Sequence, residues 1–324
     1  MTLRLGVIGV GHLGKHHARV LSTLPGVSLV GVADTNRARA DEVAAASGTR
    51  ALYDARDLLD EVQVDAVIVA VPTEKHLEIA LPFLSAGVPT LVEKPMARSI
   101  AEADEMIAAA AKAGVALAVG HTERFNPAVE RARPLLSDPR FIEVHRLGAF
   151  PDRSLDIDVV FDLMIHDLDV VLSLVDADVT SIEAVGVPVL TERVDIANAR
   201  LRFGNGCIAN VTASRISRDR VRKIRFFQPM AYVSIDYAAQ KLEVWKLVRS
   251  PGLMPSIQGG EVEVPNQEPL ERELTDFVDA VVARRPPTVD GAGGRRALAL
   301  AQQITDKMAT EMQPRKHEIT RPNL

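Results

Sequence analysis

The chain has 324 residues, of which 47% are hydrophobic, and its net charge is −5. This length exceeds what one ordinary hydrophobic core organises and predicts two domains. The acidic balance provides no electrostatic surface for nucleic acid, and no apolar run reaches the roughly 20 residues that cross a bilayer. Cys207 is the only cysteine, so no intrachain disulfide can form. We expect a cytoplasmic protein without a membrane or nucleic-acid partner.

The first 120 residues alternate short apolar strands with helices. Expected strands cover residues 3–9, 27–33, 66–71, 90–93 and 116–120, and expected helices cover 12–24, 38–47, 75–86 and 100–113. Strands that are apolar throughout, such as AVIVAV at 66–71, are typical of parallel sheets covered on both faces. The alternation therefore predicts a doubly wound α/β domain of the Rossmann type over residues 1–120.

The pattern changes over residues 121–324. Expected strands cover 141–150, 180–190, 195–203, 207–214, 222–228, 232–236 and 242–247, with helices at 127–136, 159–174, 268–284 and 294–311. Short turns between these strands indicate antiparallel hairpins, and residues 251–265 are rich in Gly and Pro and predict a loop. We expect an α+β domain with a large, mostly antiparallel open sheet, with the closing helices able to pack back on the first domain. The uncovered sheet face predicts a homodimer or homotetramer.

A glycine-rich turn follows the first expected strand directly. Gly9, Gly11 and Gly14 match the G-x-G-x-x-G spacing, with His12 and Leu13 between them. This spacing is weak evidence alone, but after a strand and before a helix it predicts a dinucleotide site. The first glycine permits the tight turn, the second lets the backbone approach a pyrophosphate, and the third allows close helix–strand packing. The helix N-terminus offers free amides to the phosphates.

Asp34 ends the second expected strand, 20 residues after Gly14. An acid at this place accepts hydrogen bonds from the adenosine ribose and repels a 2′-phosphate, which favours NAD over NADP. Arg37 and Arg39 lie close by and weaken that preference. A turn aspartate is the alternative for any such residue taken singly, but its position relative to the glycines favours the cofactor role.

Two polar clusters follow. Glu93, Lys94 and Pro95 come directly after a buried strand, at the edge where open α/β sheets bind ligands, and a lysine there can hold a substrate hydroxyl. Asp162 and His166 are four residues apart on an expected helix and share a face, so the carboxylate can orient a histidine base.

Histidine and carboxylate spacings also permit metal sites, and we expect none. His12 and His16 share a helix face, but a metal there would compete with the phosphates; we interpret His12, His16 and His17 as ordinary helix residues. Asp162, His166 and Asp169 have ligand spacing, but nothing else in the sequence completes the set, and hydride transfer to NAD needs no metal.

The order and spacing of these motifs resemble the Gfo/Idh/MocA oxidoreductases over nearly the full length. The resemblance implies that Lys94 and His166 are catalytic, with Asp162 in support. It also implies that the stretch V-P-T-E-K-H places Thr73 and His76 along the nicotinamide side of the cofactor. Met164 replaces the glycine common in the family's D-x-G-x-H form, a departure that reshapes the pocket. The full set of implied cofactor-binding residues is Gly9, Gly11, His12, Leu13, Gly14, Asp34, Thr73, His76, Glu93 and Lys94.

A narrower resemblance concerns members that act on nucleotide sugars. The segment E-R-F-N-P contains Arg124 and Asn126, and residues 146–169 are similar to members that oxidise the 3-hydroxyl of UDP-N-acetylglucosamine for amino-sugar and surface-glycan synthesis. Arg124, Asn126, Arg146 and Arg153 are then candidate substrate ligands, because arginine grips phosphate bidentately. Asn126 followed by Pro127 is equally typical of a helix start, and both roles can coexist.

We therefore predict an NAD-dependent enzyme that oxidises a secondary sugar hydroxyl. The alternatives are another polyol or aldose, of the inositol type, or a non-catalytic NAD-sensing protein, since a fold does not determine a function. A biliverdin reductase would share the architecture, but the intact Lys94, Asp162 and His166 argue against it.

Overall fold

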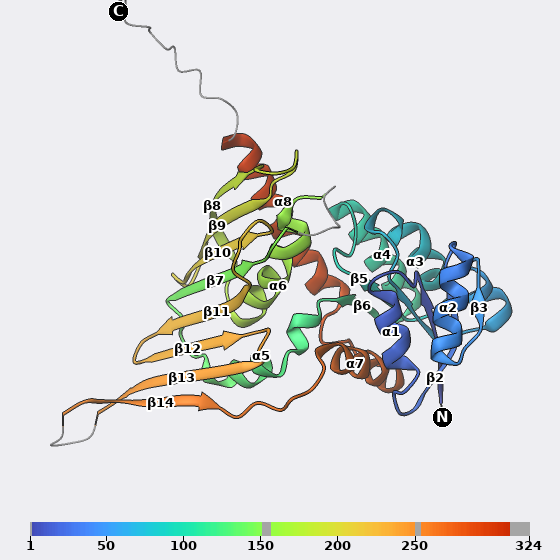
Figure 1. Ribbon diagram of the computed structural model, residues 1–324, viewed down its shortest axis with the longest axis horizontal. Helices are drawn as coiled ribbons and strands as arrows, with labels where there is room; N and C mark the ends of the chain where they lie inside the picture. Colours follow the sequence, from blue (N-terminus) through green and yellow to red (C-terminus); the bar gives the residue numbers. More distant parts are fainter. Residues whose placement is uncertain (1, 151–156, 250–253, 312–324) are drawn as a thin grey trace, which may run out of the picture. The chain divides into compact units, whose positions relative to one another are not determined.

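The computed structural model describes residues 2–150, 157–249 and 254–311. The chain forms two compact units (Figure 1). The first comprises Met1–Leu135, Ala239–Leu242 and Glu261–Ala299, and the second comprises Leu136–Ala238, Glu243–Gly260 and Leu300–Leu324. Among the described residues, no helix is both long enough and apolar enough to span a bilayer.

The first unit is built on a parallel sheet. Its strands among the described residues, in spatial order, are β3 (Ala51–Leu52), β2 (Val27–Ala33), β1 (Leu3–Ile8), β4 (Ala66–Val69), β5 (Thr90–Glu93) and β6 (Leu117–Gly120). Neighbouring strands pair in parallel throughout. This is the doubly wound order 3-2-1-4-5-6, in which the direction of winding reverses between β1 and β4, and folds with this order bind ligands at the carboxyl ends of these strands.

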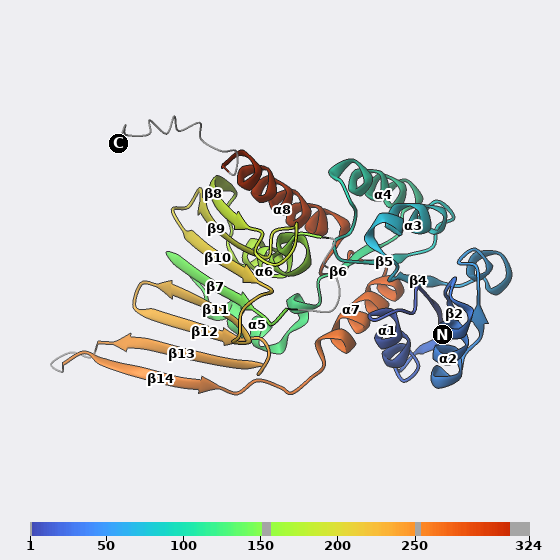
Figure 2. The same ribbon diagram turned by 45° about the horizontal axis from the view of Figure 1, so that its top comes forward.

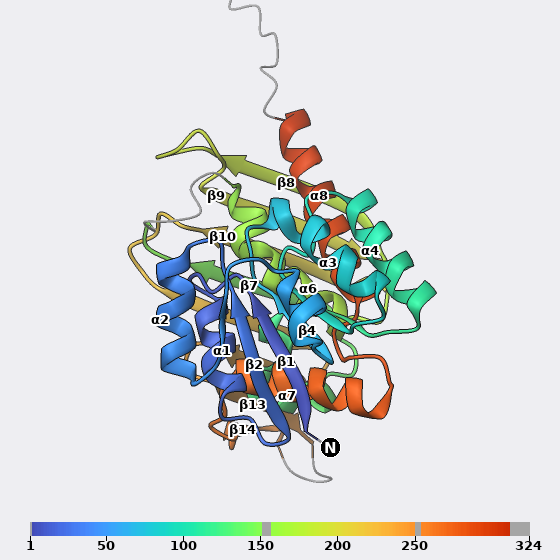
Figure 3. The same ribbon diagram turned by 90° about the vertical axis from the view of Figure 1, so that its right-hand side faces the viewer.

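Helices cover both faces of this sheet because its strands are apolar on both sides. They are α1 (Gly14–Leu21), α2 (Arg37–Ser47), α3 (His76–Ser85), α4 (Ile100–Ala113) and α7 (Pro269–Ala283). Helices α1, α2 and α7 share one core with β1 and β2, in which Leu274 and Phe277 of α7 pack with Leu5 and Leu21. Helices α3 and α4 lie together on the opposite face (Figure 3).

The second unit contains a wide sheet. In spatial order its strands are β14 (Ser256–Val262), β13 (Lys241–Val248), β12 (Ala231–Asp236), β11 (Val221–Gln228), β7 (Phe141–Leu147), β10 (Ile208–Ser214), β9 (Ile196–Phe203) and β8 (Val179–Val187). The β7–β10 pair is parallel, whereas β8–β9, β9–β10, β7–β11 and β11–β12 are antiparallel. The predicted fold class is therefore confirmed: a Rossmann unit and an α+β unit with a mostly antiparallel sheet.

One face of the wide sheet is covered by α6 (Ile165–Leu174), as Figures 1 and 2 show. Side chains alternate along β7, where Ile142 and Val144 are fully buried and their neighbours are half-buried. This period of two is what a sheet with one covered face requires. The remaining elements are η1 (Leu58–Val62), η2 (Thr73–Lys75), η3 (Thr122–Phe125), α5 (Pro127–Ala132), η4 (Arg133–Leu135), η5 (Val160–Met164) and α8 (Gly291–Glu311).

The prediction of a loop at 251–265 is wrong, because β14 occupies Ser256–Val262 as the edge strand. Its glycines concealed the strand pattern from the sequence. Gly259 has φ +149°, and a Cβ there would lie 1.9 Å from the carbonyl oxygen of Val244, so a residue without a side chain is needed for the close approach of the two strands.

The helix expected at 159–174 is also interrupted. Residues Val160–Met164 form a π turn, and the α-helix begins only at Ile165. Because π turns recur at functional sites, the position of Asp162 within this turn is consistent with a site there.

Candidate active site

The glycine loop has the shape that the fingerprint requires. Gly9 has φ +80°, a conformation that favours glycine, and a Cβ on Gly14 would lie 1.8 Å from the carbonyl oxygen of Gly9. A Cβ on Gly11 would approach only the Nη1 atom of Arg39, at 3.8 Å. Packing therefore requires the first and third glycines, whereas the second leaves open space for a ligand, and the loop fits a dinucleotide pyrophosphate.

Asp34 lies beside this loop at the end of β2. Its Oδ2 accepts a hydrogen bond from the N–H of Val10 at 3.0 Å, and its Oδ1 accepts one from the N–H of Asn36 at 2.8 Å. The Nη1 atom of Arg39 is 3.7 Å from Oδ2. The carboxylate is thus fixed next to the glycine loop, where it fits a ribose hydroxyl pair.

His12 and Leu13 are the exposed residues of the turn. Leu13 is 40% exposed, and the rings of His12 and His16 meet edge to face with centroids 5.9 Å apart. Across the described residues, no group of three or more histidine, cysteine or acidic side chains is arranged to hold a metal ion.

His76 joins the loops that follow β4 and β5. Its Nδ1 lies 3.0 Å from the carbonyl oxygen of Pro95 and its Nε2 lies 2.9 Å from that of Val71. A neutral imidazole has only one N–H to donate to these two oxygens. Burial lowers the pKa of His76, which keeps the ring neutral. The ring therefore joins two loops within the first unit. Thr73, which is half-buried, begins the short turn η2 that directly precedes His76.

Glu93 and Lys94 are placed by the end of β5. Lys94 is half-buried and follows the strand directly, and the peptide bond from Lys94 to Pro95 is cis. The Glu93 side chain is 8% exposed; its Oε1 lies 2.7 Å from Nε2 of His17 and its Oε2 accepts the backbone N–H of Lys94 at 3.1 Å. Protein groups therefore contact both carboxylate oxygens of Glu93, which favours a supporting role for this residue.

His17 is the residue that sequence reasoning missed in this part of the site. We expected an ordinary helix residue, but its side chain is 1% exposed and is bonded to Glu93. The available signal was its place three residues after Gly14, on the buried face of α1. Its partner lies 76 residues away, so no local pattern could identify the pair.

The E-R-F-N-P segment forms η3 and the start of α5. Asn126 is 1% exposed, its Oδ1 accepts the N–H of Ala128 at 3.1 Å, and it caps α5 with Pro127 in the first turn. Arg124 is half-buried on η3. The first residue of η3, Thr122, is held by α7, because Glu273 accepts a hydrogen bond from its hydroxyl at 3.1 Å. The alternative interpretation as a helix start is confirmed.

Asp162 and His166 belong to the second unit and are half-buried. Asp162 lies in the π turn and His166 in the first turn of α6. Four residues are slightly less than one π turn and slightly more than one α turn, so both side chains still share a face despite the irregular helix.

Arg146, which was predicted as a substrate ligand, is buried and paired with a carboxylate. It is 4% exposed, and its Nε and Nη2 atoms donate to the two oxygens of Asp167 at 2.6 and 3.0 Å. Its guanidinium also lies 5.3 Å from the ring centroid of Tyr237. This bidentate pair joins β7 to α6 next to His166, an arrangement that favours a structural role for Arg146. Arg153, the other arginine of this set, lies outside the described residues.

A second buried ion pair holds the segment that precedes the π turn. Arg215 is 1% exposed, donates to Oδ1 of Asp195 at 2.8 Å and donates to the carbonyl oxygen of Ile157 at 2.8 Å. Burial would raise the pKa of Asp195, but the backbone N–H groups of Leu190 and Thr191 and the Arg215 guanidinium hold it far below its usual range. Sequence reasoning missed this network because its members lie on separate segments.

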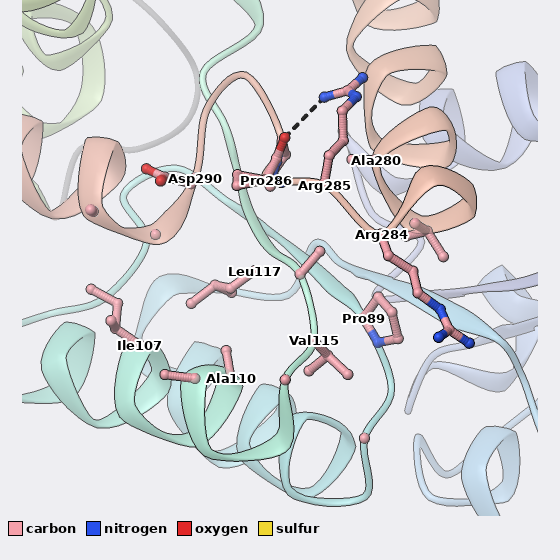
Figure 4. Close-up of a pocket in the computed structure, with 18 residues that line it drawn as sticks. Pro89, Ile107, Ala110, Val115, Leu117, Ala280, Arg284, Arg285, Pro286 and Asp290 are labelled. Carbon is pink, nitrogen blue, oxygen red and sulfur yellow. Dashed lines mark hydrogen bonds between the residues drawn. The ribbon is translucent and has the colours of Figure 1, made fainter.

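The first unit also contains a cavity of about 710 Å³ near the amino ends of its strands, opposite to the ends that bear the glycine loop (Figure 4). Pro89 and Leu117, which adjoin the amino ends of β5 and β6, line it with Ile107, while Arg285 of the loop after α7 donates to the carbonyl oxygen of Pro286 at 2.9 Å. None of the predicted site residues line it, so it is separate from the cofactor edge.

The sheet order, the glycine loop and Asp34 together define a dinucleotide-dependent enzyme fold. A family model described as an oxidoreductase family with an NAD-binding Rossmann fold matches residues 3–121, and a model of the GFO/IDH/MocA C-terminal domain matches residues 135–228. The predicted cofactor, NAD, and the oxidoreductase class are thereby confirmed.

Full-length relatives narrow this class. The chain is 41% identical over 306 residues to the UDP-N-acetylglucosamine 3-dehydrogenase of Acidithiobacillus ferrooxidans, covering 93% of this chain and 96% of that protein. A solved structure of that enzyme has a TM-score of 0.89 at 39% identity, covering 96% of this chain and 99% of the other. The myo-inositol 2-dehydrogenase of Thermotoga maritima is 25% identical over 334 residues, covering 98% and 99% of the two chains. The chain belongs to the Gfo/Idh/MocA family of oxidoreductases.

Proposed function

We propose that the chain oxidises the 3-hydroxyl of UDP-N-acetylglucosamine in the cytoplasm, with NAD as the oxidant. The observation that carries this proposal is the similarity to the Acidithiobacillus ferrooxidans enzyme over nearly the whole chain. Lys94, Asp162 and His166 are all present at the positions that the family resemblance implies for catalysis.

The roles of the three side chains follow from their chemistry. Lys94 donates a hydrogen bond to the reacting hydroxyl oxygen, and His166 accepts the hydroxyl proton. Asp162 orients the imidazole and stabilises the positive charge that it gains. The carbon–oxygen bond becomes a carbonyl as the carbon–hydrogen bond breaks, and NAD, when bound, accepts that hydride. The proposal requires Lys94 and His166 to reach the same hydroxyl.

Substrate recognition is proposed at fewer residues than the sequence indicated. Arg124 is the proposed diphosphate ligand in the described part of the chain, because a guanidinium binds phosphate bidentately. Asn126 holds the start of α5 and so positions Arg124, which is two residues before it. Arg153 remains a proposed second phosphate ligand. For the cofactor, we propose the glycine loop with His12 and Leu13, together with Asp34 and Thr73, and His76 as the support behind them.

The test is a direct assay of the purified protein. With NAD and UDP-N-acetylglucosamine, we expect the NADH absorbance of the wild type to rise with time. The rate of this rise should be lower by roughly a hundredfold or more in the Lys94→Met and His166→Asn variants. Both variants should retain NADH binding by fluorescence titration. Lys112→Met, at an exposed lysine of α4, is the matched control and should keep wild-type activity.

Two outcomes would redirect the proposal. Activity with myo-inositol and none with the nucleotide sugar would favour the second candidate, which the similarity to the Thermotoga maritima enzyme supports. NADH binding without turnover of any sugar or polyol would favour a non-catalytic NAD sensor. Full activity in a folded Lys94→Met variant would refute the assignment of the lysine.

We also propose a homo-oligomer formed through the wide sheet. On the face away from α6, the ring of Phe227 lies tilted against those of Phe141 and Tyr232, with centroids 5.6 and 5.2 Å away. Phe227 is 38% exposed and Trp245 on β13 is 41% exposed, and an exposed apolar patch of this kind is typical of interfaces. Light scattering should show a dimer or tetramer that Phe227→Asp weakens; a monomeric wild type at assay concentration would refute this.

A further inference from the structure

A buried pair connects the helix that follows the glycine loop to the candidate catalytic lysine. His17 lies on α1 and Glu93 ends β5, and the two side chains, 1% and 8% exposed, approach to 2.7 Å. The other carboxylate oxygen of Glu93 accepts the backbone N–H of Lys94 at 3.1 Å. Glu93 therefore links His17 to the backbone of Lys94.

The protein makes room for this carboxylate. A Cβ on Gly120, at the end of β6, would lie 2.9 Å from Oε2 and 3.2 Å from Cα of Glu93. Glycine at this position leaves the space that the Glu93 side chain fills. A buried carboxylate is costly unless hydrogen bonds compensate it, so the surroundings of Glu93 are specific to a charged group.

The hydrogen-bond geometry indicates where the protons lie. Within the described residues, Nδ1 of His17 is buried and has no hydrogen-bond partner. An N–H at that atom would have no acceptor, which favours the neutral tautomer that donates its one N–H from Nε2 to Glu93. The pair then carries one negative charge, located on Glu93.

This charge acts on Lys94. Burial would raise the pKa of Glu93, but the hydrogen bond from His17, the positive charge of Lys94 and the hydrogen bond from the Lys94 backbone hold it below its usual range. By reciprocity, the ionised Glu93 favours the protonated, donating form of Lys94. His76 also experiences the Glu93 charge, so His17, Lys94 and His76 are the titratable groups coupled to this carboxylate.

We propose that His17 is a positioning residue for Lys94. It keeps the Glu93 carboxylate buried and charged next to the Lys94 backbone, and the carboxylate in turn holds that backbone and keeps the lysine side chain protonated as a hydrogen-bond donor. The inference rests on the proposed function only in treating Lys94 as the group that binds the reacting oxygen.

The experiment measures Lys94 directly in the full-length protein. The pH dependence of Lys94 acetylation by acetic anhydride, followed by mass spectrometry, gives a midpoint that needs no substrate. In His17→Leu, Glu93 loses its donor and burial neutralises it, so we expect the Lys94 midpoint to fall by about one pH unit. The kcat should also fall by roughly tenfold, because the Lys94 backbone loses the carboxylate that positions it and a misplaced catalytic group slows the reaction, while the NADH dissociation constant stays within about threefold.

Two variants separate positioning from packing. His17→Gln restores an uncharged donor near the place of Nε2 and should return both the midpoint and kcat toward wild type. His16→Leu makes the same replacement one residue earlier, at a half-buried position on the same helix, and should change neither quantity.

Each outcome decides the proposal. An unchanged Lys94 midpoint in a folded His17→Leu variant that binds NADH would overturn it. If His17→Leu does not fold, Glu93→Gln replaces it, because it removes the charge with His17 in place; an unchanged midpoint there also overturns the proposal. A shifted midpoint together with full activity in Lys94→Met would support the link between His17 and Lys94 and refute the proposed function instead.

Discussion

Removal of the Arg146 guanidinium should destabilise the second unit rather than weaken substrate binding. Arg146 is 4% exposed and Asp167 is fully buried, and two hydrogen bonds of 2.6 and 3.0 Å join them. In Arg146→Met the carboxylate of Asp167 stays buried without its cation. Methionine retains most of the side-chain volume against Tyr237, so the change isolates the lost charge.

The magnitude follows from this burial. Breaking a buried ion pair on one side costs about 3–5 kcal/mol, whereas replacing both partners by apolar side chains is often close to neutral. We therefore expect Arg146→Met to lose about 3–5 kcal/mol of unfolding free energy. Arg146→Met combined with Asp167→Leu should recover most of that loss, because both charges of the pair are then replaced by apolar side chains.

Urea unfolding followed by circular dichroism compares the single and double variants with the wild type, and KM for the nucleotide sugar is measured on the same preparations. A double variant as unstable as the single one would mean that the pair does not account for the loss. If instead Arg146→Met changes stability by less than about 0.5 kcal/mol and raises KM, the guanidinium binds substrate and the reasoning from burial is wrong.

Two further predictions concern carboxylates. Asp34→Ala should weaken NADH binding by roughly ten- to a hundredfold, the loss expected for hydrogen bonds to a charged group. It should also narrow the preference for NADH over NADPH, because the charge that repels a 2′-phosphate is gone. Fluorescence titration with both cofactors checks this, and an unchanged ratio of the two affinities contradicts it. Asp195 has a lowered pKa in the folded state, so its stabilising contribution is complete above the unfolded pKa of about 3.9 and is lost as the pH falls further. The difference in unfolding free energy between wild type and Asp195→Asn should be constant above about pH 5 and shrink below about pH 4; a difference that persists at lower pH would show that hydrogen bonding to a neutral group, not ionisation, is responsible.

Much of the first unit could be predicted because its signals are local. Strand β4 is buried on both faces and is therefore apolar at every position. The glycine spacing and Asp34 are determined by contacts within one strand–turn–helix–strand segment, so their order along the chain already describes their geometry. Elements with two-residue or glycine-rich strands, such as β3 and β14, lack that signal.

The sequence by itself determined the fold class, the cofactor and the residue types available for catalysis, since each depends on periodicity or on spacing over a few residues. Only the tertiary structure decided which polar residues have buried protein partners. Arg146, Glu93 and His17 each have buried partners 21 or 76 residues away. The role of a charged side chain depends on the group that compensates it in space, and that partner is set by packing rather than by neighbours along the chain.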